Sequence, residues 1–242
     1  MNKLDQYTSH YREGAPTSLE NNLLLNWYPR RILDRLGPPL DRSLLELGLG
    51  HGITAVQFHP HFGKHDVIEG SPEVISLFKA KNELPRLNII ESYFESFATD
   101  QRFDVIIMGF VLEHVDDPAL IVEKYRGLLA PGGRLFIAVP NAKSFNRRLG
   151  LALGKINDIY ELNANDHQQG HQRQFCLDTL KQLMTDNGYI VPWVEGIYLK
   201  PLPLPVLQTL PDFEANLLAM CEVGVGFPEL CVGLLIEAVS VT

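Results

Sequence analysis

The sequence predicts one domain of the α/β class, built as a doubly wound, mostly parallel sheet of seven strands with helical cap insertions. Apolar segments of strand length alternate with helical segments between residues 40 and 140. The segment at 103–108 is apolar almost throughout, which is typical of a strand covered on both faces. The expected strands lie at 44–47, 66–68, 87–90, 103–108, 134–139, 189–196 and 230–239.

The chain before the first strand, 1–36, is interpreted as a flap followed by a helix. Residues 1–18 are polar with scattered aromatic side chains and end close to a Gly-Ala-Pro sequence, which argues against a continuous helix there. Apolar residues at helical spacing then predict a helix up to residue 36. Pro29 is expected to kink or divide that helix.

The first expected strand ends in three glycines at alternate positions, Gly48, Gly50 and Gly52. Glycine permits positive φ angles and lets a ligand approach the backbone closely, and the helix expected at 53–58 presents unpaired N–H groups at its start. The turn therefore indicates a site for a nucleotide-like ligand. A purely conformational use of these glycines is the alternative interpretation.

An acid, Glu69, follows the second expected strand about twenty residues after the turn. In a βαβ unit, an acid at this place can accept hydrogen bonds from both hydroxyls of a ribose. The sequence Ser71-Pro72-Glu73 is a good helix start, with serine as the cap. The spacing favours adenosine binding.

The exits of the third and fourth strands are the next candidates for ligand contacts. Residues 92–97 mix polar and aromatic side chains, which indicates either a pocket for a planar base or a short helix with aromatic residues in the core. The fourth strand leads through a polar turn into a helix expected at 119–129. A Pro-Gly-Gly sequence at 131–133 should close that helix before the fifth strand.

Two later segments interrupt the alternation. Residues 141–175 follow the carboxyl end of the fifth strand, where ligands bind in this architecture, and are interpreted as a substrate cap. Residues 198–229 begin with a stretch rich in proline and leucine and are interpreted as an apolar lid. Helices are expected at 145–153, 177–187 and 213–221. The whole chain, 1–242, is expected to form a single domain.

Composition narrows the class of protein. A net charge of −8 argues against a general affinity for nucleic acid. Three cysteines without metal-ligand spacing suggest a reducing compartment, so we expect a cytoplasmic protein. The chain shows neither a secretion signal nor an apolar run long enough to span a membrane. The oligomeric state stays open, with a homodimer among the options.

Several separated motifs together carry a resemblance to a known family. They are the segment 44–52, Glu69, 103–107 with 112–115, and 128–133. In their order and spacing they resemble the Rossmann-like class I S-adenosylmethionine-dependent methyltransferases, within the group that includes ubiquinone-pathway and other small-molecule enzymes. The segment 170–175 also resembles one common in this group. The resemblance implies methyl transfer from S-adenosylmethionine to a small molecule, at oxygen or nitrogen.

The resemblance also implies contacts around the glycine turn. Gly48, Gly50 and Gly52 should shape the loop beside the methionine part of S-adenosylmethionine. Glu46 should help to hold that region through hydrogen bonds. Glu69 should bind the hydroxyls of the ribose.

Further contacts are implied along the sheet edge. Gly70 and Ser71 should lie beside the ribose, and Tyr93 and Phe94 should contact the adenine. The family often has an acid at the start of that aromatic segment, whereas this chain has a serine, so the contact to the adenine amino group is in doubt. Phe110 should lie between cofactor and substrate.

Methyl transfer to a hydroxyl or an amine is helped by a base that takes the acceptor's proton. His114, His167 and His171 are the imidazoles near the expected sheet edge. The sequence around His114 is common in the family whatever the substrate, which favours the two histidines of the cap as the base. Ordinary surface positions are the alternative for both. Three arginines are candidates for binding an anionic acceptor or for plain surface positions: Arg147, Arg148 and Arg173.

A divalent-metal site in the cap is a further possibility. Asp166, His167 and His171 place a carboxylate and two imidazoles close together in the sequence, and on a helix the two histidines would share a face. The neighbouring Asn, Gln and Gly residues favour a loop instead. We therefore predict no metal site.

Two other classes of function remain open at this point. A nicotinamide-dependent oxidoreductase also uses a glycine-rich first turn followed by an acid, although Glu46 and the Pro-Gly-Gly turn argue against it. The other alternative is a protein that binds S-adenosylmethionine without turnover.

Overall fold

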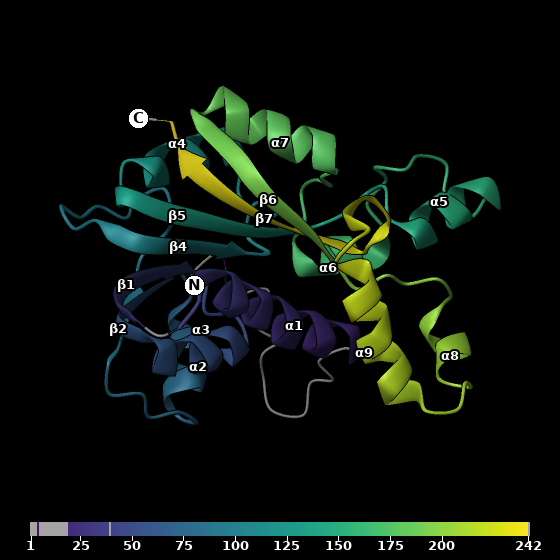
Figure 1. The fold of residues 1–242 in the computed structure, drawn as a ribbon, viewed down its shortest axis with the longest axis horizontal. Coiled ribbons are helices and arrows are strands. Elements are labelled where there is room, and N and C mark those ends of the chain that lie inside the picture. Colours follow the sequence, from purple (N-terminus) through teal and green to yellow (C-terminus); the bar gives the residue numbers. More distant parts are fainter. Residues whose placement is uncertain (1–3, 5–18, 39, 242) are drawn as a thin grey trace.

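The computed structural model describes residue 4, residues 19–38 and residues 40–241. Its strands are β1 (Leu40–Leu47), β2 (Phe62–Glu69), β3 (Leu87–Glu91), β4 (Phe103–Gly109), β5 (Leu129–Pro140), β6 (Tyr189–Ile197) and β7 (Gly233–Ser240). They form one sheet in the order β3-β2-β1-β4-β5-β7-β6 (Figure 1). The first five strands run parallel, and β7 is antiparallel to both of its neighbours. The predicted doubly wound, mostly parallel sheet is confirmed.

The helices alternate with these strands as expected through β5. They are α1 (Leu19–Leu36), α2 (Ile53–Phe58), α3 (Pro72–Lys79), α4 (Pro118–Arg126), α5 (Phe145–Ala152), α6 (Ala164–Gln169), α7 (Leu177–Asp186), α8 (Leu204–Leu207) and α9 (Phe213–Gly224). The predicted start of α3 is confirmed, because the Ser71 hydroxyl accepts a hydrogen bond from the Val74 N–H at 3.2 Å.

The helix expected at 119–129 is shorter than predicted. It ends at Arg126, and Leu129 already pairs with Phe103 of β4. The Phe103 N–H also donates to the Leu128 carbonyl at 2.8 Å. Pairing with β4 thus gives the backbone N–H and C=O groups their hydrogen-bond partners before the Pro-Gly-Gly sequence begins. That sequence therefore lies within β5.

The helix α1 is continuous through Pro29, so the predicted division there was wrong. Tyr28, Ile32 and Leu36 are buried along one side of α1 and belong to a core shared with the sheet. Burying this apolar stripe outweighs the loss of one backbone hydrogen bond at the proline.

Alternate residues of each strand serve the two faces of the sheet. Leu45 and Leu47 of β1 belong to a core shared with α4 and α7, whereas Leu44 belongs to the core shared with α1 and α9. Ile106 and Ile107 of β4 divide in the same way. Figure 1 shows α4 and α7 on one side of the sheet and α1 and α2 on the other. Burial on both faces accounts for the apolar strands.

The segments after β5 gather beyond the carboxyl ends of the parallel strands, where α5, α6, α8 and α9 lie (Figure 1). α6 forms where a loop was expected, because Asn163 and Asp166 make a capping box at its start. Within the segment interpreted as a lid, Leu207 and Leu217 pack into the core shared with α1. Its action as a lid stays a prediction.

The flap expected at 1–18 lies, except for Leu4, outside the described residues. None of the helices in the described ranges combines the length and the apolar character needed to cross a lipid bilayer.

Candidate active site

A cavity of about 780 Å³ opens at the carboxyl ends of β1, β2 and β4. One wall is made by the turn between β1 and α2 and by the start of α3. Further lining residues come from the turn after β4 and from the cap, which contributes Asn165, His167 and residues 169–172. The parallel sheet brings these loops together because all three strands end at the same edge. Candidate ligand contacts predicted from separate motifs therefore share one space.

The glycine turn adopts the conformation that only glycine tolerates well. The φ angles of Gly48, Gly50 and Gly52 are 82°, 50° and 73°, and all three residues line the cavity. A Cβ atom at Gly52 would lie 2.2 Å from the Cδ2 atom of Phe78, a residue of α3. Backbone geometry thus requires glycine in this turn, and the turn also faces the cavity. Contact of these glycines with a ligand stays a prediction.

Glu69 presents a buried carboxylate to the cavity. Its Oε2 atom accepts a hydrogen bond from the Leu49 N–H at 3.0 Å, and its Oε1 atom accepts one from the Ser71 N–H at 2.8 Å. Burial raises the pKa of Glu69, and these backbone donors partly oppose the rise. The acid is therefore held in one orientation. Gly70 and Ser71 line the cavity beside it.

Glu46 lies behind the cavity wall rather than in it. Its buried carboxylate accepts a hydrogen bond from the Thr54 hydroxyl and lies 3.1 Å from the Nε2 atom of His65. Thr54 lines the cavity from the first turn of α2. Glu46 thus anchors the start of α2 through Thr54, and its part in holding the cofactor region stays a prediction.

The aromatic segment after β3 is divided between the cavity and the core. Tyr93 and Phe94 line the cavity, and Phe97 is buried with its ring stacked on that of Tyr125. The Tyr125 hydroxyl donates to the Phe94 carbonyl at 3.1 Å and so holds the segment in place. The segment is a turn and not the short helix of the second interpretation, although Phe97 does lie in the core as that interpretation expected. Contact with a planar base stays a prediction.

Phe110 lines the cavity directly after β4 in a strained conformation. Its φ of 56° lies in the left-handed region, which bulky residues rarely adopt. Its ring makes an edge contact with Tyr28 of α1, with the ring centroids 5.8 Å apart. Tyr28 also lines the cavity, although its place among the apolar residues of α1 gave no signal of this.

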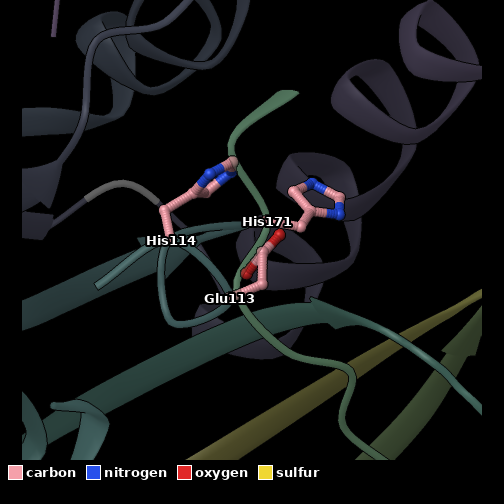
Figure 2. A group of neighbouring side chains, drawn as sticks. All are labelled: Glu113, His114 and His171. Carbon is pink, nitrogen blue, oxygen red and sulfur yellow. The ribbon is translucent and has the colours of Figure 1, made fainter. Parts of the chain in front are cut away.

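A polar cluster lines part of the cavity, and Figure 2 shows its three side chains. It consists of Glu113 and His114 from the turn after β4 and of His171 from the cap. The rings of His114 and His171 meet edge to face, with centroids 4.8 Å apart. The Nδ1 atom of His171 lies 3.0 Å from the Oδ1 atom of Asp166.

Burial dominates the electrostatics of the cluster. It raises the pKa of Glu113 to about 7, against the pull of nearby His171. Burial, with His171 alongside, lowers the pKa of His114 to about 4, so His114 is neutral at pH 7. Sequence reasoning gave Glu113 no role of its own. Its position beside His114 at the end of a parallel strand was the available signal.

The histidine pair of the cap does not share a helical face. His167 lies on α6 and lines the cavity, whereas Gly170, with a φ of 79°, ends the helix before His171. The residues that come together with His171 in the cavity wall are Glu113 and His114.

Two of the candidate arginines support the loops. Arg173 donates hydrogen bonds to the carbonyls of Leu112 and Asp116 at 3.2 and 3.1 Å, which ties the cap to the turn after β4. Arg147 donates to the Ile159 carbonyl at 2.8 Å within the cap. Neither is among the described residues that line the cavity.

Comparisons with known proteins agree with this arrangement. A family model described as a methyltransferase domain matches residues 24–191. The ubiquinone biosynthesis O-methyltransferase of Leptothrix cholodnii is 32% identical over 219 residues, which span 87% of this chain and 88% of that protein. The protein of the same name from Serratia proteamaculans is 31% identical over 133 residues, or 53% of this chain and 54% of that protein. The chain thus spans about half the length of the Serratia relative.

The fold has solved counterparts. The N-methyltransferase NodS of Bradyrhizobium japonicum, in complex with S-adenosylhomocysteine, matches with a TM-score of 0.63 at 15% identity, and the match covers 100% of both chains. At this identity the likeness concerns the fold alone.

Proposed function

Since the chain belongs to the S-adenosylmethionine-dependent methyltransferases, we propose that it methylates a hydroxyl oxygen of a small molecule. The enzyme class and the cofactor follow from the family. The acceptor and the base are our proposal, supported by the O-methyltransferase relatives and by the histidine-lined wall. Membership in this family excludes the nicotinamide-dependent oxidoreductase and the non-catalytic binding protein that the sequence left open.

The residues of the cavity fit S-adenosylmethionine. The carboxylate of Glu69, held by backbone hydrogen bonds from Leu49 and Ser71, lines the cavity, which supports its role as the acceptor for the ribose hydroxyls. The left-handed glycines leave room along the turn for the methionine part. Tyr93 and Phe94 offer aromatic surface for the adenine.

When bound, S-adenosylmethionine supplies a methyl group that its sulfonium already activates. The chain must then hold the acceptor oxygen in line with that methyl group and keep water out. Phe110 and Tyr28 form an apolar part of the wall between the glycine turn and the polar cluster, which supports a separating role for Phe110. An oxygen–methyl bond forms as the sulfur–methyl bond breaks, and the acceptor loses its proton.

We assign removal of that proton to the histidine-lined wall. The observation that carries the assignment is the hydrogen bond between Asp166 and the Nδ1 atom of His171. It leaves the Nε2 atom of His171 as the nitrogen that can act on the acceptor, in an orientation held by the carboxylate. His114 and His167 line the same wall and complete the set of candidate bases.

The interpretations of the later segments remain part of the proposal. Residues 141–175 act as the substrate cap, supported by the presence of Asn165, His167 and residues 169–172 in the cavity wall. Residues 198–229 act as an apolar cover, supported by their packing against α1. A cytoplasmic protein is supported by three free cysteines in the described chain.

The test follows a labelled methyl group. The protein is incubated with S-adenosylmethionine carrying a radiolabelled methyl and with small phenols, alcohols and the matching amines. Label in the hydroxyl compounds supports the proposal, and label in amines alone overturns the assignment to oxygen. His171→Ala should lower kcat about 100-fold, as expected for loss of a general base, with affinity for S-adenosylhomocysteine unchanged.

His61→Ala is the matched control. His61 ends the short 3-10 helix (His59–His61) directly before β2, away from the carboxyl ends of the strands, and is not among the described lining residues. It should leave both kcat and affinity as in the wild type. An equal loss of kcat in this variant would show that the effect of His171→Ala is not local.

A further inference from the structure

Three potential metal ligands converge from two segments that are far apart in the sequence. Glu113 and His114 belong to the turn after β4, and His171 follows α6 (Figure 2). One ligand atom from each, a carboxylate oxygen and two imidazole nitrogens, lies within 4.8 Å of the other two. From the sequence, Asp166, His167 and His171 were the candidate ligands, and no metal site was predicted. The sequence does not show that the turn after β4 lies beside His171.

Glu113 is the least explained polar group of the cavity. Its side chain is fully buried, and apart from its own backbone N–H no group in the described part of the chain offers its carboxylate a hydrogen bond. A buried carboxylate without partners is costly, and buried charges are normally paired or bound to metal ions. The carboxylate is therefore suited to bind a cation.

The two histidines are already oriented as metal ligands usually are. Asp166 accepts from the Nδ1 atom of His171 at 3.0 Å and is itself held by the Asn163 N–H at 2.8 Å and by the Gln174 amide at 3.2 Å. The backbone of Gly170 lies beside the His114 ring. Metal-binding histidines typically give their second nitrogen to a carboxylate or a backbone carbonyl in this way.

We propose that Glu113, His114 and His171 bind a divalent transition-metal ion, with Zn²⁺ as the favoured occupant. Two imidazoles and one carboxylate suit Zn²⁺ and its neighbours, whereas Mg²⁺ prefers oxygen ligands throughout. Ligand atoms around a tetrahedral Zn²⁺ lie roughly 3.4 Å apart. Small side-chain rotations that draw the three groups together by about 1 Å complete the site, with the fourth position left to the cavity.

The ion takes part in the proposed methyl transfer. Its catalytic role therefore rests on the proposed function. A hydroxyl bound at the fourth position ionises more readily, as water does on Zn²⁺. With the ion bound, His171 acts as a ligand and no longer as the base. The proton then passes to His167, another candidate base of the same wall, which lines the cavity outside the three ligands. The freed oxygen lone pair forms the bond to the methyl group as the sulfur–methyl bond breaks.

Metal binding can be measured without any acceptor. Full-length protein is stripped with a chelator, titrated with Zn²⁺ by calorimetry, and then loaded with Co²⁺ to record its visible absorption. We expect one equivalent of Zn²⁺ and the intense bands of tetrahedral Co²⁺. Glu113→Gln and His171→Ala should each weaken binding at least 100-fold, and Asp166→Asn, which alters only the outer partner, about 10- to 100-fold.

Glu95→Gln is the control, because Glu95 lines the same cavity but is exposed. It should bind Zn²⁺ as the wild type does. Absence of a stoichiometric site in the wild type, or equal affinity in Glu113→Gln and the wild type, overturns the proposal. A variant that fails to fold cannot be compared with the wild type. The Co²⁺ spectrum of the wild type tests the site without any variant, and a spectrum without tetrahedral bands counts against the site.

The two proposals fail in different ways. A chelated enzyme that methylates hydroxyls at the full rate overturns the catalytic role of the metal and leaves the proposed function intact. A protein that binds Zn²⁺ through these ligands but labels only amines keeps the metal site and overturns methylation at oxygen.

Discussion

The carboxylate of Glu69 accepts a hydrogen bond from the backbone N–H of Leu49 at 3.0 Å. This bond ties the acid at the end of β2 to the glycine turn after β1. A second bond, from the Ser71 N–H at 2.8 Å, ties the same carboxylate to the start of α3. A ligand that binds Glu69 is thereby held against the glycine turn, which suits a cofactor with a ribose next to an amino-acid chain.

Replacing Glu69 should weaken cofactor binding strongly. Glu69→Ala removes the acceptor proposed for two ribose hydroxyls, and hydrogen bonds to a charged group contribute about 1.5 to 3 kcal/mol each. We expect the affinity for S-adenosylhomocysteine, measured by calorimetry, to fall at least about 100-fold. Glu91→Ala is the control, because Glu91 pairs with Glu69 in the sheet but is exposed and outside the described cavity lining. Unchanged affinity in Glu69→Ala would show that the ribose lies elsewhere.

Gly52→Ala should destabilise the protein through two separate effects. The left-handed backbone costs a residue with a Cβ about 1 to 2 kcal/mol, and overpacking against Phe78 adds about 1 to 3 kcal/mol. Gly132→Ala carries only the first cost, because its φ is 75° and no atom lies within 4 Å of the added Cβ. Urea unfolding of both variants should therefore separate the clash from the backbone term. Equal losses would mean that Phe78 moves aside freely.

Thr54→Val should destabilise the fold beneath the glycine turn. The change keeps the shape but removes the hydroxyl that donates to the buried Glu46 carboxylate. Loss of a hydrogen bond to a buried charge should lower the free energy of unfolding by about 1 to 3 kcal/mol. Thr54→Ser retains the hydroxyl and should recover most of this loss in thermal unfolding. A Val variant as stable as the wild type would show that His65 alone satisfies Glu46.

Glu237 should make the fold sensitive to acid. It accepts hydrogen bonds from Arg134 at 2.5 Å and from Arg35 at 2.7 Å, and so links β7 to β5 and α1. Burial alone would raise the pKa of Glu237, but these two bonds outweigh it and hold the pKa below its ordinary value. The stabilisation is complete above the unfolded-state pKa and is lost as the pH falls towards the lower folded-state pKa.

Glu237→Gln tests this link. It should lower the free energy of unfolding near neutral pH by about 1 to 3 kcal/mol, since both arginines are partly exposed. The free energy of unfolding of this variant should also fall less steeply as the pH decreases, as measured by denaturant unfolding across the acidic range. Glu214→Gln, at an exposed position of α9, should change neither. A variant with an undiminished acid response would assign that response to other carboxyl groups.

The elements that sequence reasoning placed well are those with local signals. The alternation of apolar segments, the Ser71 cap and the glycine turn each depend on residues that are neighbours in the chain. The errors came where contacts between distant residues outweighed such signals. Packing of Tyr28 and Ile32 against the sheet carried α1 through Pro29, and pairing of Leu129 with Phe103 drew the segment before the Pro-Gly-Gly sequence into β5.

The sequence by itself determined the family and the sheet, and it predicted residues that line the cavity, because in a parallel sheet the motifs that follow successive strands meet at one edge. Only the tertiary structure brought together the polar cluster of Glu113, His114 and His171. His171 and Glu113 belong to segments with no shared spacing, and they meet because Arg173 and the cap segment fold back onto the turn after β4. Such a meeting depends on packing between distant segments, which no local pattern in the chain records.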